Sequence, residues 1–523
     1  MSNNTIITKW NKGNFEQILQ MFNMNSLNDP KEIYFFLDSY LQLKKFEDVS
    51  KNINLFDTTQ RINEEYTFIK NILNLRMLLL MGNIPEVEKN LAKLEKSNLN
   101  STNGMNGWLY FNSKLVRAIL FFMKTDCNSA LKVLDQQEVE FTNIEGQFPD
   151  YNLSMFYNLK ATVVWKIGEE KRALQEITKS ISLNEKYDNK IKLANDLVIR
   201  GQIYIDLGEF LKSLMDYEDA KRIYLEHKNS YGVKMVELSI AEMKFIQGKL
   251  GDALTIFENS VENIMLNEYQ TSEIYLLMGK IYQKRKNYAK ALLSYEKALE
   301  LSEKINFSFY KSFTLVNIID MLVETNQIEK IENYNNKFDK NSENETIKLM
   351  YVMIEALIKQ SKKQFKEAKE SWIFINTSPG LPIQLKIYTL ENALKNCIKI
   401  WNDEKEAGLL SEIEDITEKW EKLATDNFLM SSLATIYLLK SKFYLAMFQS
   451  ENAKKFLQEG IKLSEKCGLE IDLNDIEKDK EKIAKIEKLE HSGIQEQAGL
   501  DIKLEDILDY LKNVKMSLIL DKN

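Results

Sequence analysis

The stretch 272–304 reads SEIYLLMGKIYQKRKNYAKALLSYEKALELSEK and consists of two amphipathic segments joined by a short charged turn. Both segments carry small or large apolar residues at regular offsets: Tyr275, Met278, Gly279 and Tyr282, then Ala291, Tyr295 and Ala298. Spacings of three and four residues place such side chains on one face of an α-helix. The small Gly279 and Ala291 let two helices approach closely, while the tyrosines fill the space around them. The stretch therefore predicts a helical hairpin.

The hairpin pattern recurs from Leu37 to Ala453. Positions equivalent to Ala291 follow at steps of 37 to 46 residues: Val49, Val87, Ala130, Ala173, Ser213, Ala253, Ile331, Ala368, Ala407 and Ala453. Twelve residues before each lies the position equivalent to Gly279: Leu37, Leu75, Ala118, Ala161, Gly201, Ala241, Ile319, Ala356, Lys395 and Ser441. The recurrence predicts eleven hairpins, and the repeat with a lysine at a packing position fits least well.

The turns follow the same register. Seven residues after the first-helix position, glycine or asparagine recurs, at Gly82, Gly168, Gly208, Gly248, Asn326 and Asn402. These two residue types tolerate the left-handed backbone conformation that ends many helices. We therefore expect the first helix of each hairpin to end there.

The order aromatic, apolar–Gly, Tyr, Ala, Tyr, Ala in 272–304 resembles the tetratricopeptide repeat family, although the family's usual closing proline is missing. Residues 154–304 fit best, and the period is nearer 40 than the family's usual value of about 34. The resemblance implies an all-α, right-handed superhelical α-solenoid of about eleven antiparallel hairpins. It also implies a protein that binds other proteins.

The repeat pattern stops near Asn474, so we expect the solenoid at 1–474 and a different C-terminal region at 475–523. Asp475–Glu490 is a highly charged helix. After a linker, a final helix carries an apolar stripe: Leu504, Ile507, Leu508, Leu511, Val514 and Leu518. One interpretation is a cap that shields the last repeat, which a stacked array requires. The other is a tail that folds back into the groove or engages a partner.

Composition excludes several classes of function. A formal net charge of −7 argues against a nucleic-acid partner, which needs a concentrated basic face. The N-terminal residues lack the pattern of a signal peptide, and no apolar run approaches the roughly 18 residues that span a bilayer. Cys127, Cys397 and Cys467 are few, odd in number and widely separated, as expected for free thiols in a reducing compartment. We therefore expect a cytoplasmic protein without membrane insertion.

Signatures of catalysis and metal binding are absent from the sequence. It contains no phosphate-binding, dinucleotide-binding, zinc-protease or serine-hydrolase motif, and His227 and His491 are its only histidines. Without a CxxC pair, a zinc site has no local ligands. We expect no catalytic residue, no cofactor and no metal.

Each first helix should present a polar stripe on the side away from its hairpin partner, and stacking lines these stripes along a groove. In the central repeats the candidate partner-binding residues are Asn158, Trp165, Asn195, Gln202, Glu242, Phe245, Lys280, Gln283 and Lys284. Amide side chains both donate to and accept from a peptide backbone, and buried aromatic side chains anchor interfaces. The alternative for each single residue is an ordinary solvated helix face.

Three functions compete on this evidence. The first is a non-catalytic scaffold that holds a peptide or helix of a partner protein in the groove. The second is a regulatory sensor that responds to a peptide or small ligand, and the third is an enzyme, which the missing motifs argue against. The sequence leaves the partner's identity and the oligomeric state open.

Overall fold

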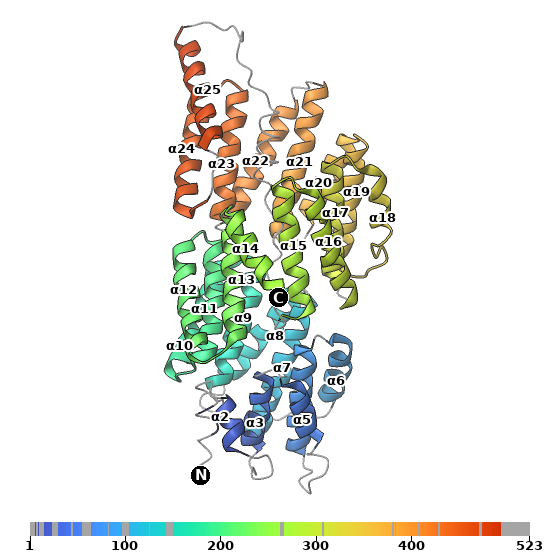
Figure 1. Cartoon of the computed structure of the whole chain (residues 1–523), viewed down its shortest axis with the longest axis vertical. Coiled ribbons are helices and arrows are strands. Elements are labelled where there is room, and N and C mark those ends of the chain that lie inside the picture. The colour runs from blue at the N-terminus through green and yellow to red at the C-terminus, as the bar shows by residue number, and fades with distance from the viewer. Residues whose placement is uncertain are drawn as a thin grey trace. The chain divides into compact units, whose positions relative to one another are not determined.

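The computed structural model describes residues 15–22, 30–42, 45–54, 64–81, 83–96, 104–124, 126–142, 150–261, 266–305, 308–378, 383–404, 408–426, 429–469 and 473–492, together with Ile6, Lys9 and Leu381. Within these residues all regular secondary structure is helical, in 24 helices labelled α2 to α25 (Figure 1). After α2 (Phe15–Met21), the helices α3 to α24 form eleven consecutive pairs, and α25 follows them. The predicted all-α solenoid of helix hairpins is confirmed.

The chain divides into two compact units. Unit 1 comprises residues 1–203, 213–233 and 522–523. Its helices after α2 are α3 (Pro30–Gln42), α4 (Phe46–Asn54), α5 (Glu64–Leu80), α6 (Ile84–Lys96), α7 (Gly104–Met123), α8 (Cys127–Thr142), α9 (Asp150–Lys166), α10 (Glu170–Lys186), most of α11 (Lys190–Asp206) and most of α12 (Phe210–Glu226).

Unit 2 comprises residues 204–212 and 234–521. Its helices are most of α13 (Ser230–Ile246), α14 (Leu250–Val261), α15 (Glu268–Lys284), α16 (Tyr288–Lys304), α17 (Ser308–Glu324), α18 (Ile328–Asn335), α19 (Glu345–Ser361), α20 (Phe365–Thr377), α21 (Ile383–Glu404), α22 (Gly408–Asp426), α23 (Met430–Ala446), α24 (Ser450–Cys467) and α25 (Leu473–Ser492).

The predicted packing positions form the core of the hairpins. The positions equivalent to Gly279 and Ala291 that the structure describes are all buried, except Lys395, whose side chain is 15% exposed. Ala407 lies outside the described residues. A Cβ atom on Gly279 would stand 2.5 Å from ring carbons of Tyr295, so the α15–α16 pair is as close as a glycine permits. Lys395 instead pairs with Glu391 on its own helix, and the predicted register is wrong in this repeat.

The turn prediction holds with one exception. Gly168, Gly208, Gly248 and Asn326 all have positive φ. Three residues at the same offset also have positive φ although they are neither glycine nor asparagine: Lys286, Lys363 and Phe448. Asn402 lies inside α21, because that helix continues for 22 residues, and its assignment to a turn was wrong. Gly82 lies outside the described residues.

Two turns early in unit 2 contact helices near its C-terminal end. Gly208 approaches α23 and α24 so closely that a Cβ atom there would stand 2.5 Å from Cβ of Met430 and 3.1 Å from Sγ of Cys467. In the next turn, Gln247 Nε2 donates to the carbonyl oxygen of Cys467 at 3.4 Å, across 220 residues of sequence. The left-handed φ of +70° at Gly208 and the lack of space both require glycine there.

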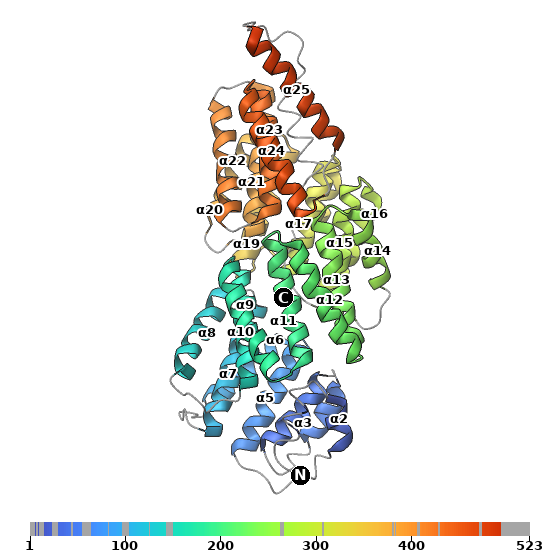
Figure 2. The ribbon, with the colours of Figure 1, turned by 90° about the vertical axis from the view of Figure 1, so that its left-hand side faces the viewer.

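The charged helix α25 packs against α24 and α23 (Figure 2). Its buried side chains include Ile476, Ile483 and Ile486. Lys442 Nζ of α23 lies 2.6 Å from Asp479 Oδ2 and 2.9 Å from Asp475 Oδ2. The expected final helix at 504–518 lies outside the described residues, and the domain division at 474 stays a prediction. Across the part of the chain that the structure describes, no helix has both the length and the apolar character to cross a membrane.

Candidate functional site on the first helices

The first helices α15 and α17 of unit 2 are enclosed along most of their length, whereas α19 and the second helix α16 keep an exposed face. In α15 every residue from Ser272 to Gln283 is buried except Tyr275, and in α17 every residue from Phe309 to Leu322 is buried except Lys311. In the second helix α16, by contrast, buried residues recur only at helical spacing. The first helices therefore bury polar as well as apolar side chains.

Polar side chains link the first helices α15, α17 and α21, and all of them are buried except the exposed Glu324 and the half-buried Lys395. We call the following set the unit 2 wall: Glu273, Lys280 and Gln283 of α15, Asn317, Asp320 and Glu324 of α17, and Tyr388, Glu391 and Lys395 of α21. Gln283 Nε2 donates to Glu324 Oε2 at 2.7 Å, which joins α15 to α17. The Tyr310 hydroxyl of α17 donates to Glu273 Oε1 of α15 at 3.3 Å.

The wall continues from α17 to α21. Burial raises the pKa of Tyr388 well above its usual value, and the nearby carboxylates of Asp320 and Glu391 raise it further. Tyr295 donates its hydroxyl hydrogen to Gln283 Oε1 at 2.8 Å, and burial together with Asp320 and Glu324 raises its pKa in the same way. Acidic and phenolic groups thus follow one another along three first helices.

Five predicted partner-binding residues belong to unit 2, and four of them lie against other side chains of that unit. Gln283 joins the wall through its amide, and Lys280 lies with Nζ 4.8 Å from the ring centroid of Phe313. Lys284 Nζ lies 5.2 Å from the ring centroid of Phe245, which is itself buried. Glu242 is half-buried on α13. These side chains do not form an ordinary solvated face.

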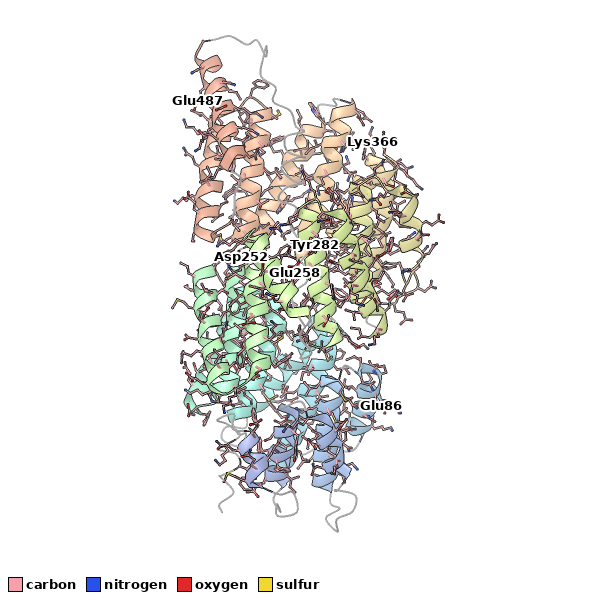
Figure 3. The ribbon with its side chains drawn as sticks, viewed as in Figure 1. Glu86, Asp252, Glu258, Tyr282, Lys366 and Glu487 are labelled. Atoms are coloured by element: carbon pink, nitrogen blue, oxygen red, sulfur yellow. The ribbon has the colours of Figure 1, made fainter. Side chains whose placement is uncertain are left out.

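Contacts with the second helices hold the first helices in place. Tyr282 of α15 donates its hydroxyl hydrogen to Glu258 Oε1 of α14 at 2.6 Å (Figure 3). Burial and the adjacent Glu258 raise the pKa of Tyr282 to about 12. This contact lies outside the unit 2 wall and joins α15 to the helix before it, α14.

The other four predicted residues belong to unit 1, where two of them hold internal hydrogen bonds. Asn158 Nδ2 of α9 donates to Asp196 Oδ1 of α11 at 2.7 Å. Asn195 Oδ1 accepts the hydroxyl hydrogen of Tyr224. Trp165 is buried under Lys166, whose Nζ lies 4.4 Å from the indole centroid, and Gln202 is half-buried.

Asp196 is a structural carboxylate that the sequence pattern did not reveal. Besides Asn158, it accepts from Ser180 Oγ and Asn184 Nδ2 of α10, each at 2.7 Å. Burial raises its pKa from 3.8 to about 7, even though these hydrogen bonds lower it. Its position in the sequence could have indicated burial, because Asp196 lies between Leu193 and Leu197 on the packing face of α11 and off the polar stripe.

A second buried ionic group of unit 1 was equally hidden in the sequence. Arg76 Nη1 of α5 lies 2.7 Å from Asp38 Oδ1 of α3, and its guanidinium also donates to the Tyr34 hydroxyl. Burial lowers the pKa of Lys192 to about 7, while nearby Asp38 opposes this effect. No sequence spacing connects positions 38, 76 and 192, so only the folded chain brings them together.

Two segments of the chain match family models for the tetratricopeptide repeat, residues 235–304 and residues 434–467. These two segments carry tetratricopeptide repeats. A TPR repeat-containing protein of Methanocaldococcus jannaschii is 24% identical over 191 residues. That match covers 35% of this chain and 31% of the relative, so it spans less than a third of the relative's length.

Solved structures of TPR-like solenoids show a general likeness. A Rap protein complexed with Competence and Sporulation Factor is 13% identical with a TM-score of 0.47, covering 81% of this chain and 99% of that chain. NprR in complex with its cognate peptide NprX is 14% identical with a TM-score of 0.48, covering 65% and 96%. Yeast Tom70 is 15% identical with a TM-score of 0.40, covering 89% and 98%. TM-scores below 0.5 say nothing about what this chain binds.

Proposed function

We propose that this protein is a non-catalytic interaction scaffold that binds a peptide or helix of a partner protein against its first helices. The observation that carries the proposal is the unit 2 wall, where amide, carboxylate, ammonium and phenol groups of α15, α17 and α21 follow one another. An extended peptide offers a backbone donor and acceptor at each residue, which such a mixed set can bind. Lys284, next to Gln283 on α15, adds a half-buried ammonium group to the polar set.

The wall makes contacts of its own, and a ligand must exchange for some of them. Gln283 and Glu324 bind each other, and Glu391 binds Lys395. The wall can then exist with these pairs closed or open. A ligand that binds the open form more tightly shifts the equilibrium toward it, and the size of the shift equals the difference between its affinities for the two forms. If binding opens these pairs, the second candidate function is favoured over a passive scaffold. That function is a regulatory module that responds to a peptide or small ligand.

The test compares partner capture by a wall variant and by a surface variant. Gln283→Ala with Glu324→Ala removes the α15–α17 contact, whereas Lys297→Ala with Glu300→Ala removes an exposed pair of α16 whose charged atoms are 2.8 Å apart. We expect affinity purification with mass spectrometry to recover a partner with wild type and the surface variant. The wall variant should retain less than a tenth of it.

A synthetic peptide from the recovered partner, crosslinked to the wild-type protein, then identifies the contacted helices. Crosslinks to α15, α17 or α21 support the proposal. Equal capture by both variants would remove the unit 2 wall as the binding site, and wild-type protein that recovers no direct partner would remove the scaffold function. A change of hydrogen exchange in the wall on peptide binding would favour the regulatory candidate.

A further inference from the structure

Three aromatic rings lie together on the hairpin of α23 and α24. The Tyr444 and Phe456 rings are stacked, with their centroids 5.4 Å apart and their planes 9° apart. The Tyr437 ring centroid lies 5.6 Å from that of Phe456. We call these three residues the ring cluster. All three side chains are half-buried, so part of the ring cluster is open to solvent.

Carboxylates of α22, which packs against α23, lie beside the ring cluster. Glu414 and Glu418 are one turn apart on α22, and both are exposed. The Tyr444 hydroxyl donates to Glu414 Oε1 at 3.3 Å. Burial and the carboxylates of Glu414, Glu418 and Glu421 raise the pKa of Tyr444. Accessible carboxylates and accessible rings therefore form one surface, which we call the α22–α24 surface: Glu414, Glu418 and the ring cluster.

Lysines of the chain itself show which chemical group this region binds. Lys440 Nζ of α23 lies 5.2 Å from the Phe456 ring centroid, and it forms an ion pair with Glu421 of α22. Lys455 Nζ lies 5.5 Å from the same centroid. An ammonium group is thus already held between a ring and a carboxylate. The Lys440 side chain is only 6% exposed, so it neutralises Glu421 and leaves the exposed Glu414 and Glu418 to a ligand.

We infer that the α22–α24 surface binds an arginine-bearing segment of a partner protein, on the Tyr444 ring beside Glu414 and Glu418. This surface lies outside the unit 2 wall, and the inference does not depend on the proposed function. A guanidinium group carries only donors, which match carboxylate oxygens, and its flat face stacks on aromatic rings. An acidic segment would be repelled by the carboxylates, and a purely apolar one would bury them without a partner.

The test measures the affinity of the full chain for two synthetic twelve-residue peptides, one of alternating glycine and arginine and one of alternating glycine and glutamine. At about 0.15 M salt, charges more than about 8 Å apart are largely screened, which limits the contribution of net charge. We expect wild type to bind the arginine peptide at least tenfold more tightly than the glutamine peptide. Glu414→Gln with Glu418→Gln should weaken binding of the arginine peptide at least fivefold. Tyr444→Leu with Phe456→Leu should do the same although it keeps every charge.

Two control variants should keep the affinity of wild type within twofold. Glu451→Gln with Glu465→Gln removes two exposed carboxylates of α24 that helical geometry places on a different face from Phe456. Gln283→Ala with Glu324→Ala changes the unit 2 wall and leaves the α22–α24 surface intact.

The outcomes separate this inference from the proposed function. Equal weakening in the charge control, unchanged affinity in the leucine pair, or equal binding of the two peptides by wild type would overturn the inference and leave the proposed function standing. Weakening in the wall variant alone would place the arginine peptide at the unit 2 wall and also overturn it. A wild type that binds neither peptide but self-associates in light scattering, with the association lost in the leucine pair, would replace the partner by a second copy of this chain. Thermal melting by circular dichroism checks folding. If the leucine pair does not fold, the glutamine pair decides, because glutamine at position 414 can still accept from the Tyr444 hydroxyl.

Discussion

Replacing Asn158 by alanine tests whether this side chain supports the fold or is available to a partner. In the structure its amide donates to Asp196 Oδ1, one of three hydrogen bonds on that fully buried carboxyl. The substitution leaves Oδ1 without this donor. Hydrogen bonds to charged groups contribute about 1.5–3 kcal/mol and neutral ones about 0.5–1.5 kcal/mol. The loss should therefore depend on whether Asp196 is ionised.

The sign of the pH dependence follows from the raised pKa of Asp196. Since its pKa is about 7 in the folded protein and 3.8 ordinarily, the folded state holds a proton that the unfolded state releases between these values. Stability from this group is therefore fully present below pH 4 and is lost as the pH rises to 7, by at most about 4 kcal/mol. Lys192, whose pKa is lowered to about 7, acts in the opposite direction above pH 7, so only the difference between wild type and variant isolates Asp196.

We expect Asn158→Ala to lower the local unfolding free energy of α9 and α11 by about 2 kcal/mol at pH 8.5 and about 1 kcal/mol at pH 5.5. A chain of two units has no single global unfolding transition, so the unfolding free energy is measured locally, by hydrogen exchange followed by mass spectrometry. The amides should exchange about 30-fold faster at pH 8.5 and about 5-fold faster at pH 5.5. Gln202→Ala, on half-buried surface of α11, is the control, and its effect should stay within about 0.5 kcal/mol. Unchanged exchange in Asn158→Ala would refute the structural role and leave Asn158 available to a partner.

Three further predictions concern packing and the C-terminal helix. Gly279→Ala should destabilise unit 2 by about 1–3 kcal/mol through overpacking against Tyr295. Gly408→Ala is the control and should not lower the melting temperature, because a Cβ there meets nothing within 4 Å. Similar melting temperatures for the two variants would contradict the Gly279–Tyr295 contact. Lys442→Ala leaves Asp479 buried without its cation, so α25 should lose about 3–5 kcal/mol of protection and be cleaved first in limited proteolysis. The double variant Lys442→Met with Asp479→Leu should restore much of this protection, and failure to do so would count against the ion pair as the cause. Cys397, whose thiol pKa burial raises to about 12, should react with a maleimide more slowly than an exposed cysteine at pH 7.5, and rapid labelling would show that the α21 core opens readily.

The spacing of small and aromatic residues was sufficient to predict the hairpins. Gly279 and Ala291 could be recognised because close helix packing tolerates few residue types, and small residues occupy both equivalent positions in the central hairpins. The turns at Gly168, Gly208 and Gly248 were predictable for the related reason that a left-handed residue favours glycine. Lys286, Lys363 and Phe448 adopt the same conformation without that signal, so only the offset identifies them.

The candidate site was harder to predict because a polar residue on a helix does not state what it faces. The sequence pattern places Asn158, Gln283 and Lys280 on a stripe expected to face a groove, and in the structure they contact other parts of their own units. Their role in binding a partner stays a prediction. Asp196 and Glu391 were missed because a carboxylate in an apolar run differs little, in sequence, from one on a solvated face.

Local sequence periodicity thus determined the helices, their pairing and most of their turns, since these depend on side chains three to forty residues apart on one repeating register. The tertiary structure alone decided which polar groups meet. Tyr388 lies beside Asp320, and Gln247 meets Cys467, because stacking of hairpins brings first helices and turns together across intervals that no sequence period encodes. The chemistry of the unit 2 wall therefore arises from the path of the hairpins and not from a motif in any one of them.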